Sequence, residues 1–530
     1  MRARIINQAQ FTHIPTSTPV SSLKVFCWGI FLIIALVISG CIPGSSNLFR
    51  GELDALGGMG AEAAMTSGTD IPGISLADPY PTRPRYSPGE LVDYTAQSGD
   101  TLTSLASRFN TTIEEILEAN PFIPLSATTM PPSMPMKIPI YYVPLWGSPY
   151  QIIPDSHFVN GPYQVGFDTQ EYVNSQPGWL KDYTNFAADV NRTGANMVDY
   201  VAHYYSVSPR LLLALLEYHA GALTQAEVSS ESEDYPLGYR HWSRKGLFLQ
   251  LIWAANLLND GYYSFRISKL TSIEHKNGRI ERFDPWQNAA TMSLHQYFNA
   301  ILEYDEYIIA ISPEGFAQTY KSLFGDPWKN DQFHIPGSLV QPAIIFPFEP
   351  DDVWALTGGP HPAWGSGEPY AALDFAPPSK TSGCVPSDVW ATAVSEGVVV
   401  RSGNGEVMLD LDGDGDERTG WNIFYLHVRS DGRAPVGAHL MQGDRIGHPS
   451  CEGGSSTGTH IHIARKYNGE WMPAEGIGGG VLAFNMEGWV AHNGRQIYLG
   501  TLTRNSQVVT ACTCSNAASF IQSDRKTEQQ

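Results

Sequence analysis

The segment Gly453 to Ala464 constrains the fold of this chain most strongly, because a run rich in glycine, serine and threonine leads there into His-Ile-His-Ile. Successive side chains of a β-strand point to opposite faces, so His460 and His462 emerge together while the isoleucines pack on the other side. Such a pair can be two surface or core histidines, or it can hold a metal ion. The small residues before it let the backbone approach a ligand closely, as at the rim of a cleft.

Further blocks contain residues that could complete a metal site. Gly358-Gly359-Pro360-His361 and Trp364-Gly-Ser-Gly precede Ala371-Ala-Leu-Asp374-Phe-Ala-Pro, and Phe424-Tyr-Leu-His427 lies between these blocks and the His-x-His pair. With these motifs the chain resembles the lysostaphin and β-lytic type of zinc metalloendopeptidase, a family that cuts peptide cross-links in bacterial cell walls. The resemblance covers residues 346–475.

The resemblance also implies which residues bind zinc. One branch of the family has His-x-x-x-Asp as its first ligand pair, but here Tyr370 stands four residues before Asp374. The β-lytic branch instead spaces this pair widely, with Gly-Gly-x-His at its start, and His361 and Asp374 match that form. The implied ligands are therefore His361, Asp374 and His462.

The two remaining histidines, His427 and His460, match catalytic positions of the family. Two imidazoles and one carboxylate would leave zinc a fourth position for water, which is typical of a catalytic zinc site. One histidine would then take the water proton and return it to the leaving amine, and the other would bind the oxyanion. The sequence leaves open which does which. The alternative function is a non-catalytic peptidoglycan-binding regulator of other cell-wall hydrolases.

Residues 1–40 predict an export signal. They contain three basic residues, no acidic residue and an apolar run from Val25 to Ile38. Ile38-Ser-Gly-Cys41 resembles a bacterial lipobox, which implies cleavage before Cys41 and lipid attachment to its thiol. An uncleaved membrane anchor is the alternative. Either way we expect the chain outside the cytoplasm, anchored to a membrane or secreted to the wall, with residues 41–90 as a flexible linker.

Residues 91–141 predict a small domain with the order strand, helix, helix, strand. With the sequence Gly99-Asp-Thr-Leu it resembles a LysM module, which binds glycans that contain N-acetylglucosamine. The resemblance implies a sugar groove between the loop at Gly99, Asp100 and Thr101 and the loop after Asn120, where main-chain polar groups make most contacts. The alternative is a βααβ domain that has lost its sugar.

Residues 150–335 predict an α-helical domain of unknown role. Ser208 and Pro209 form a helix start, and Gly221 forms a stop. The helix between them also resembles the catalytic helix of lysozyme-like transglycosylases, but Glu217 is not at the position of the acid there. A spacer or a substrate-binding domain is therefore the preferred interpretation.

Residues 340–480 predict a mainly antiparallel β peptidase domain, followed by a C-terminal extension at 481–530. Two apolar runs, Val-Val-Val at 398–400 and Val-Met-Leu at 407–409, flank a Gly-Asn-Gly turn and indicate a hairpin, here called the valine-rich hairpin. The fold class is thus multidomain, with βααβ, α-helical and antiparallel β parts.

Asp410, Asp412 and Asp414 have the alternating spacing of a calcium-binding loop, although Trp421 stands where an EF-hand needs glutamate. The alternative is a solvated acidic turn. Four cysteines outside the signal, Cys384, Cys451, Cys512 and Cys514, allow three disulfide pairings in an oxidising compartment.

The formal net charge of −20 argues against a nucleic-acid partner, since phosphate binding needs a basic face. The sequence therefore predicts a zinc endopeptidase that acts on peptidoglycan, with a LysM module that raises the local concentration of substrate.

Overall fold

The computed structural model describes residues 83–524. The predicted signal at 1–40, the lipid attachment at Cys41 and most of the predicted linker lie outside the described residues. Within 83–524, no helix is both long enough and apolar enough to cross a membrane.

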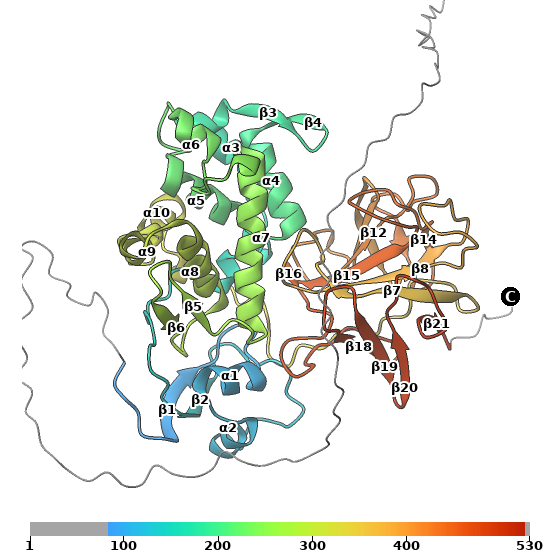
Figure 1. Ribbon diagram of the computed structural model, residues 1–530, viewed down its shortest axis with the longest axis horizontal. Coiled ribbons are helices and arrows are strands. Elements are labelled where there is room, and N and C mark those ends of the chain that lie inside the picture. Colours follow the sequence, from blue (N-terminus) through green and yellow to red (C-terminus); the bar gives the residue numbers. More distant parts are fainter. Residues whose placement is uncertain (1–82, 525–530) are drawn as a thin grey trace, which may run out of the picture. The chain divides into compact units, whose positions relative to one another are not determined.

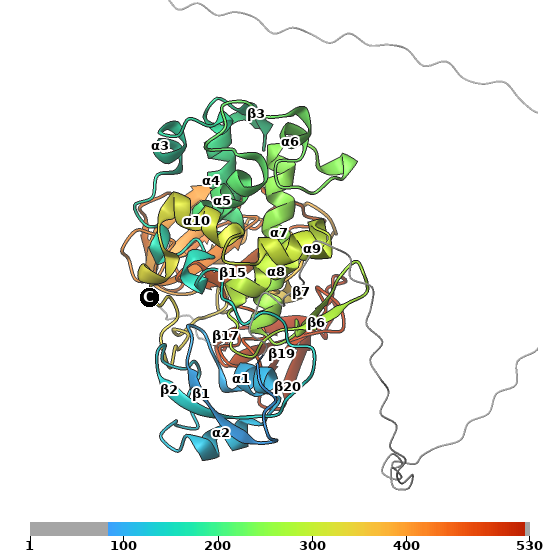
Figure 2. The same ribbon diagram turned by 90° about the vertical axis from the view of Figure 1, so that its left-hand side faces the viewer.

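The first unit has the strand, helix, helix, strand order that the sequence predicts (Figure 2). Strand β1 (Glu90–Thr95) pairs antiparallel with β2 (Pro135–Ile140), and α1 (Leu102–Phe109) and α2 (Ile113–Ala119) connect them. Each helix begins with a capping box, in which a threonine side chain accepts a hydrogen bond from the third helical N–H. These local bonds fix where the two helices start.

The next segment is mainly helical, as predicted. Its helices are α3 (Thr169–Asn174), α4 (Gly194–Tyr205), α5 (Pro209–Ala220), α6 (Ser230–Asp234), α7 (Leu247–Arg266), α8 (Ala289–Ile301), α9 (Tyr304–Ala310) and α10 (Phe316–Phe324). It also contains the hairpins β3 (Thr184–Ala187) with β4 (Val190–Thr193) and β5 (Ser272–Glu274) with β6 (Ile280–Arg282). Short 3₁₀ turns are η1 (Asp155–His157), η2 (Pro162–Gln164), η3 (Trp179–Lys181), η4 (Trp242–Arg244) and η5 (Pro327–Lys329).

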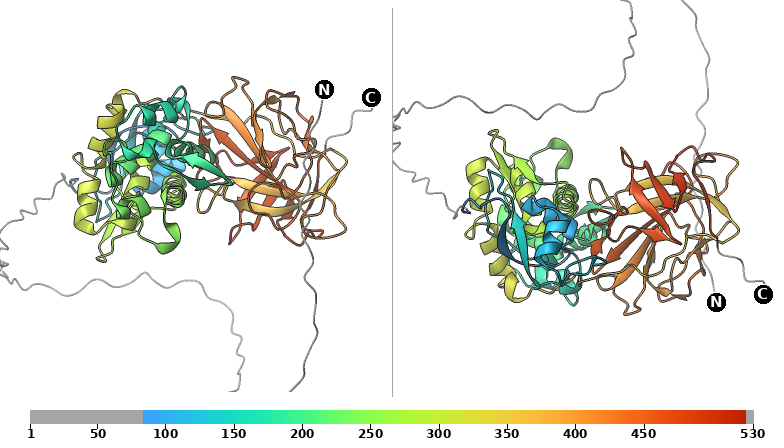
Figure 3. Two further views of the ribbon diagram at one scale, coloured as in Figure 1. Left: turned by 90° about the horizontal axis from the view of Figure 1, so that it is seen from above. Right: turned by 90° about the horizontal axis from the view of Figure 1, so that it is seen from below.

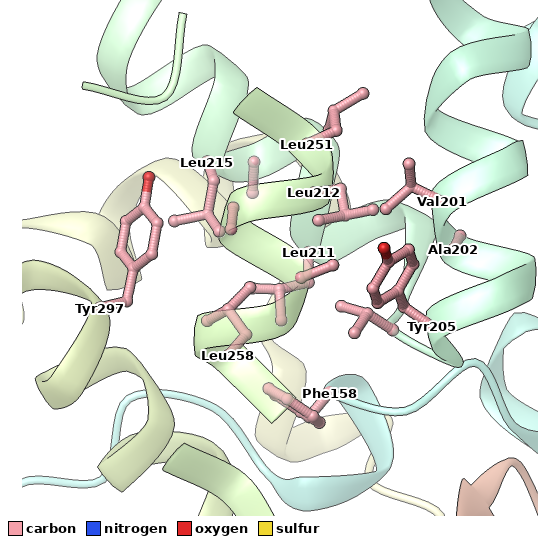
Figure 4. Packing of buried hydrophobic residues seen from close by; sticks show 14 of the residues in the cluster. Phe158, Val201, Ala202, Tyr205, Leu211, Leu212, Leu215, Leu251, Leu258 and Tyr297 are labelled. Carbon is pink, nitrogen blue, oxygen red and sulfur yellow. The ribbon is translucent and has the colours of Figure 1, made fainter. Parts of the chain in front are cut away.

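Helix α5 starts and stops where the sequence predicts. The Ser208 hydroxyl accepts a hydrogen bond from the Leu211 N–H, Pro209 occupies the first helical position, and Gly221 ends the helix in the left-handed region with φ of 57°. Most residues of α5 are buried, so the helix lies inside the helical core rather than on its surface. Figure 4 shows its leucines among leucines of α7 and Tyr297 of α8.

The C-terminal segment forms antiparallel sheets (Figures 1 and 3). The largest has the order β13-β10-β11-β12-β15-β8-β7-β21, with β16 paired to β15. Its strands are β7 (Val353–His361), β8 (Ala372–Ala376), β10 (Gly397–Gly403), β11 (Glu406–Asp410), β12 (Trp421–Leu426), β13 (His439–Leu440), β15 (Ile461–Tyr467), β16 (Glu470–Trp471) and β21 (Phe520–Gln522). Smaller sheets contain β9 (Ala391–Thr392), β14 (Arg445–Gly447), β17 (Asn485–Met486), β18 (Trp489–Asn493), β19 (Gly500–Arg504) and β20 (Gln507–Thr510).

Two findings concern the sequence interpretation of this segment. The valine-rich hairpin is confirmed, because β10 and β11 pair antiparallel around the predicted turn. The extension at 481–530 contributes β21, which pairs with β7 and so joins the main sheet.

The two faces of the main sheet pack into different cores. On β12, Ile423 and Tyr425 face the core of the C-terminal segment, whereas Phe424 faces the core shared with the helices. On β15, Ile463 and Ala464 divide in the same way. The alternation of side chains along each strand produces this separation. The helical segment therefore covers part of one sheet face.

Two disulfides pair the four cysteines, Cys384 with Cys451 and Cys512 with Cys514. The first joins residues 67 positions apart, and the second joins residues 2 positions apart. Cys451 lies shortly before the His-x-His strand, so the first bond ties a distant loop to the start of that strand.

Serine substitution of Cys384 and Cys451 should destabilise the protein more than serine substitution of Cys512 and Cys514. Loop-closure entropy gives about 4 kcal/mol for the long loop and about 1 kcal/mol for the short one. Thermal unfolding of the two double variants, followed by circular dichroism, measures the difference. The reverse order of the two melting temperatures would contradict this expectation.

Candidate metal centre and cleft

Three adjacent strands bring the predicted zinc ligands together. Asp374 on β8 and His462 on β15 are register partners, and His361 ends the neighbouring β7. Gly358 lies opposite Asp374, where a side-chain Cβ would collide with the carboxylate. Gly358 therefore leaves space for the Asp374 carboxylate.

The three ligand atoms form a small buried triangle. His361 Nε2 lies 2.9 Å from His462 Nδ1, and Asp374 Oδ1 lies 3.2 Å from each nitrogen. All three side chains are buried. Ligands at zinc distances of 2.0–2.1 Å in a tetrahedron lie about 3.3 Å apart. The spacing thus fits one small cation.

Backbone carbonyls fix the tautomers of both ligand histidines. His361 Nδ1 lies 2.8 Å from the Gly359 carbonyl oxygen, and His462 Nε2 lies 3.1 Å from that of Ala363. Since a carbonyl oxygen can only accept, each of these nitrogens must donate its proton. In the neutral rings the inward nitrogens then carry lone pairs, as does the Asp374 oxygen. Three acceptors at this distance repel one another unless a cation lies between them.

The electrostatics of the triangle agree with this geometry. Burial would raise the pKa of Asp374, but the His361 and His460 rings hold that pKa well below its usual value. Burial would lower the pKa of His361, but the Asp374 carboxylate raises it overall. Burial lowers the pKa of His462. The site therefore contains an ionised carboxylate that draws positive charge toward it.

His427 and His460 lie beside the triangle. Their ring centroids are 4.5 Å apart, and His460 Nε2 lies 3.5 Å from Asp374 Oδ1. Each ring donates its Nδ1 proton to a backbone carbonyl, that of Glu452 for His427 and that of Gly458 for His460. Burial lowers the pKa of His427 to about 4. Both rings therefore keep Nε2 free for a ligand at the site.

A cleft of about 1230 Å³ opens over the triangle. One side is formed by the small residues 454–459 that precede the His-x-His strand, as the sequence predicts, and another by the loop 377–387. The Cys384–Cys451 disulfide joins this loop to the chain just before residues 454–459. A bound chain could thus run between two covalently linked loops.

Two aromatic residues at the cleft were not identified from the sequence. Tyr498 stacks on the metal-ligand candidate His361 with ring centroids 4.4 Å apart, and lines the cleft. Trp364 also lines the cleft and stacks on Tyr204 of α4 at 4.5 Å. Trp364 begins the Trp-Gly-Ser-Gly motif but had no role assigned to it, and Tyr498 lies in no motif. Tyr498 belongs to the predicted C-terminal extension, and Trp364 is held by the helical segment.

The other predicted sites have different surroundings. Asp410, Asp412 and Asp414 can bring their oxygens within 4.8 Å of one another, so calcium binding there stays a prediction. Burial, together with Asp412, raises the pKa of Asp410 to about 6.

Glu217 accepts hydrogen bonds from the Leu223 and Thr224 N–H groups, which indicates a structural role after α5.

The four predicted glycan-binding residues lie on the two loops that the resemblance implied. Asp100 accepts hydrogen bonds from Tyr94 and Arg108, and Thr101 caps α1. The Asn120 side chain bonds the backbone of residues 116 and 137, and Gly99 lies against the Arg266 guanidinium. Their side chains thus shape the loops, and any sugar contacts would fall to neighbouring groups.

Two regions of the chain match known protein families. Residues 94–139 match the LysM domain family, and residues 151–337 match the family described as LasA, N-terminal domain. The chain is 25% identical over 353 residues to protease LasA of two Pseudomonas aeruginosa strains, which covers 63% of this chain and 77% of that protein.

Solved structures also align with part of the chain. The M23 metalloprotease pseudoalterin aligns at 22% identity over 32% of this chain and 96% of its own, with a TM-score of 0.27. The catalytic domain of lysostaphin from Staphylococcus simulans aligns at 23% identity over 23% of this chain and 81% of its own, with a TM-score of 0.16.

The sequence matches to protease LasA and to the LysM domain family therefore agree with the resemblances that the histidine motifs and the βααβ unit indicated. The chain is a homologue of protease LasA, and it carries a LysM domain.

Proposed function

We propose that this protein is a zinc-dependent endopeptidase that hydrolyses peptide cross-links of bacterial peptidoglycan. The observation that carries the proposal is the triangle of His361, Asp374 and His462, whose inward atoms are all acceptors. Such a set binds a cation, and two histidines with one carboxylate are the ligands of a catalytic zinc with an open position. Homology to protease LasA supports the same reaction class.

The reaction would use groups that already face the triangle. When bound, zinc polarises a peptide carbonyl and lowers the pKa of a coordinated water. Of His427 and His460, one accepts the water proton through Nε2 and returns it to the leaving amine. The other donates a hydrogen bond to the oxyanion as it forms. The backbone carbonyls that bind both Nδ1 atoms hold the rings in the orientation that these steps need.

The LysM domain, Cys41 and the disulfides support a proposed substrate and location. A LysM domain fits the N-acetylglucosamine-containing glycan of peptidoglycan, and its attachment to the peptidase raises the local concentration of cross-links. We propose an extracytoplasmic location, with membrane anchoring through lipid on Cys41. Two disulfides are consistent with an oxidising compartment.

Loss of a ligand should remove the metal. His361→Ala and Asp374→Ala are expected to lose stoichiometric zinc. The two remaining protein ligands and a water molecule bind zinc more weakly than three protein ligands do. Metal analysis of the purified variants measures this. His439→Ala, an exposed histidine on β13 of the same segment, is the matched control and should retain zinc. Full zinc content in both ligand variants would contradict the assigned site.

Loss of a catalytic histidine should separate binding of zinc from turnover. His427→Ala is expected to keep zinc and to lower kcat by about 10²- to 10⁴-fold, the usual contribution of a positioned acid or base. Metal content and peptide hydrolysis are measured on the same preparation. If the metal were lost with the activity, His427 would be a ligand and not a catalytic group.

Mass spectrometry of fragments released from cell walls with different cross-bridges distinguishes the enzyme from a non-catalytic regulator. An endopeptidase releases new amino termini at defined peptide bonds, whereas a regulator binds walls and releases none. The masses also identify the bond that is cut. Wall binding without new amines in zinc-loaded protein would support the regulator.

A further inference from the structure

The segment from His334 to Leu339, here called the strap, connects the helical and peptidase segments and lies in the predicted sugar groove of the LysM domain. It contacts both loops that border this groove, the loop after β1 and the loop after α2. His334, Ile335 and Leu339 of the strap are buried, whereas Pro336 and Ser338 are exposed. The LysM groove is thus occupied by a turn-containing piece of the same chain.

The first loop holds the strap through Ser98. The Ser98 hydroxyl accepts a hydrogen bond from the Ile335 N–H at 2.8 Å and lies 3.3 Å from the Ile335 carbonyl oxygen. Arg266 at the end of α7 donates to the Ser98 carbonyl at 2.5 Å and so fixes this loop from behind. Ser98 therefore contacts both main-chain polar groups of one strap residue, Ile335.

The second loop holds the strap through Thr128 and Thr129. The Thr129 hydroxyl donates to the Pro336 carbonyl at 2.6 Å and accepts from the Leu339 N–H at 3.0 Å. The Thr129 carbonyl accepts from the Ser338 N–H at 2.8 Å, and the Thr128 hydroxyl donates to the Leu339 carbonyl at 2.7 Å. The LysM domain thus binds main-chain N–H and carbonyl groups of the strap around its turn at residues 337–338.

The opposite side of the strap packs on the peptidase segment. The Ile335 and Leu339 side chains form a buried apolar cluster with Met472, Ile477 and Leu482. His334 Nε2 lies 2.8 Å from Glu470 Oε2 on β16. The apolar side chains therefore hold the strap to the peptidase segment, while its main chain holds the LysM domain.

From these contacts we propose that the strap is an internal ligand of the LysM domain, and that N-acetylated glycan binds only by displacing it. Each N-acetylglucosamine carries an acetamido group with one N–H and one carbonyl, the same pair that Ser98 and Thr129 bind in the strap. Both ligands need the same hydroxyl and main-chain groups, so they exclude each other. The proposal rests on glycan binding by this LysM domain as part of the proposed function.

Displacement would also weaken the connection between the LysM domain and the peptidase segment. Gly478 and Gly479 of the peptidase segment lie against Thr103, next to the same loop. A glycan in the groove would remove the polar contacts between the LysM loops and the strap, whereas the bond from Arg266 to Ser98 would still join the LysM domain to the helical segment.

Hydrogen exchange of the whole protein tests the proposal directly. The Ile335, Ser338 and Leu339 amides are protected by LysM groups, so a soluble β-1,4-linked N-acetylglucosamine hexamer should increase deuterium uptake of the strap. Mass spectrometry of the peptide that contains residues 334–339 measures this. Binding of the hexamer with unchanged strap uptake would overturn the proposal.

A variant of the strap gives an independent test. A Cβ at Gly337 would lie 2.5 Å from Pro131 of the second loop, so Gly337→Val should expel the strap without changing any LysM residue. We expect the hexamer to bind this variant about tenfold more tightly, since less of the groove is self-occupied. Gly403→Val is the control, because a Cβ there meets nothing within 4 Å.

Calorimetric titration of the hexamer into the three proteins measures these affinities. Equal affinities for the wild type and Gly337→Val, or no binding to either, would refute displacement. Hydrolysis of a glycan-free cross-linked peptide by the same preparations reports the endopeptidase separately. Peptide hydrolysis without glycan binding would leave the enzyme assignment intact and reject only the strap proposal.

Discussion

The alternation of side chains across one antiparallel sheet is the constraint on which the whole site depends. In β8 and β15 every second residue enters the core of the C-terminal segment, which fixes the strands in register. The residues between them, Asp374 and His462, must then point to the opposite face as direct neighbours. A shift of either strand by one residue would turn the candidate ligands into the apolar core and the core residues to the opposite face, so the apolar core specifies where the candidate ligands lie.

Backbone carbonyls determine which nitrogen atom each histidine presents to the site. The four histidines around the cleft each lie within hydrogen-bond distance of a carbonyl oxygen, and this fixes which nitrogen faces inward. Side-chain partners could rotate or change charge, whereas main-chain partners in strands and their adjoining loops cannot. The result is a preorganised set of lone pairs around one position, which is what a metal site needs before the metal binds.

The helical segment shares an apolar core with the C-terminal segment, and individual side chains add further contacts between the parts of the protein. Arg266 at the end of α7 bonds the LysM loop and also lies 3.2 Å from Glu470 on β16. Trp364 joins α4 to the rim of the cleft. Trp364 on the cleft and Arg266 beside the LysM loop therefore both connect the C-terminal segment to the helices.

The sequence by itself determined the local features of this protein. The cap at Ser208, the valine-rich hairpin and the alternation around His462 are set by neighbouring residues, so each could be predicted from the chain. The ligand set came from a family resemblance, because residues 101 positions apart, such as His361 and His462, have no local relation. Only the tertiary structure decided the disulfide pairing, the place of Tyr498 on His361 and the strap in the LysM groove. These depend on which distant surfaces meet, and burial of apolar area drives that choice without leaving a periodic signal in the sequence.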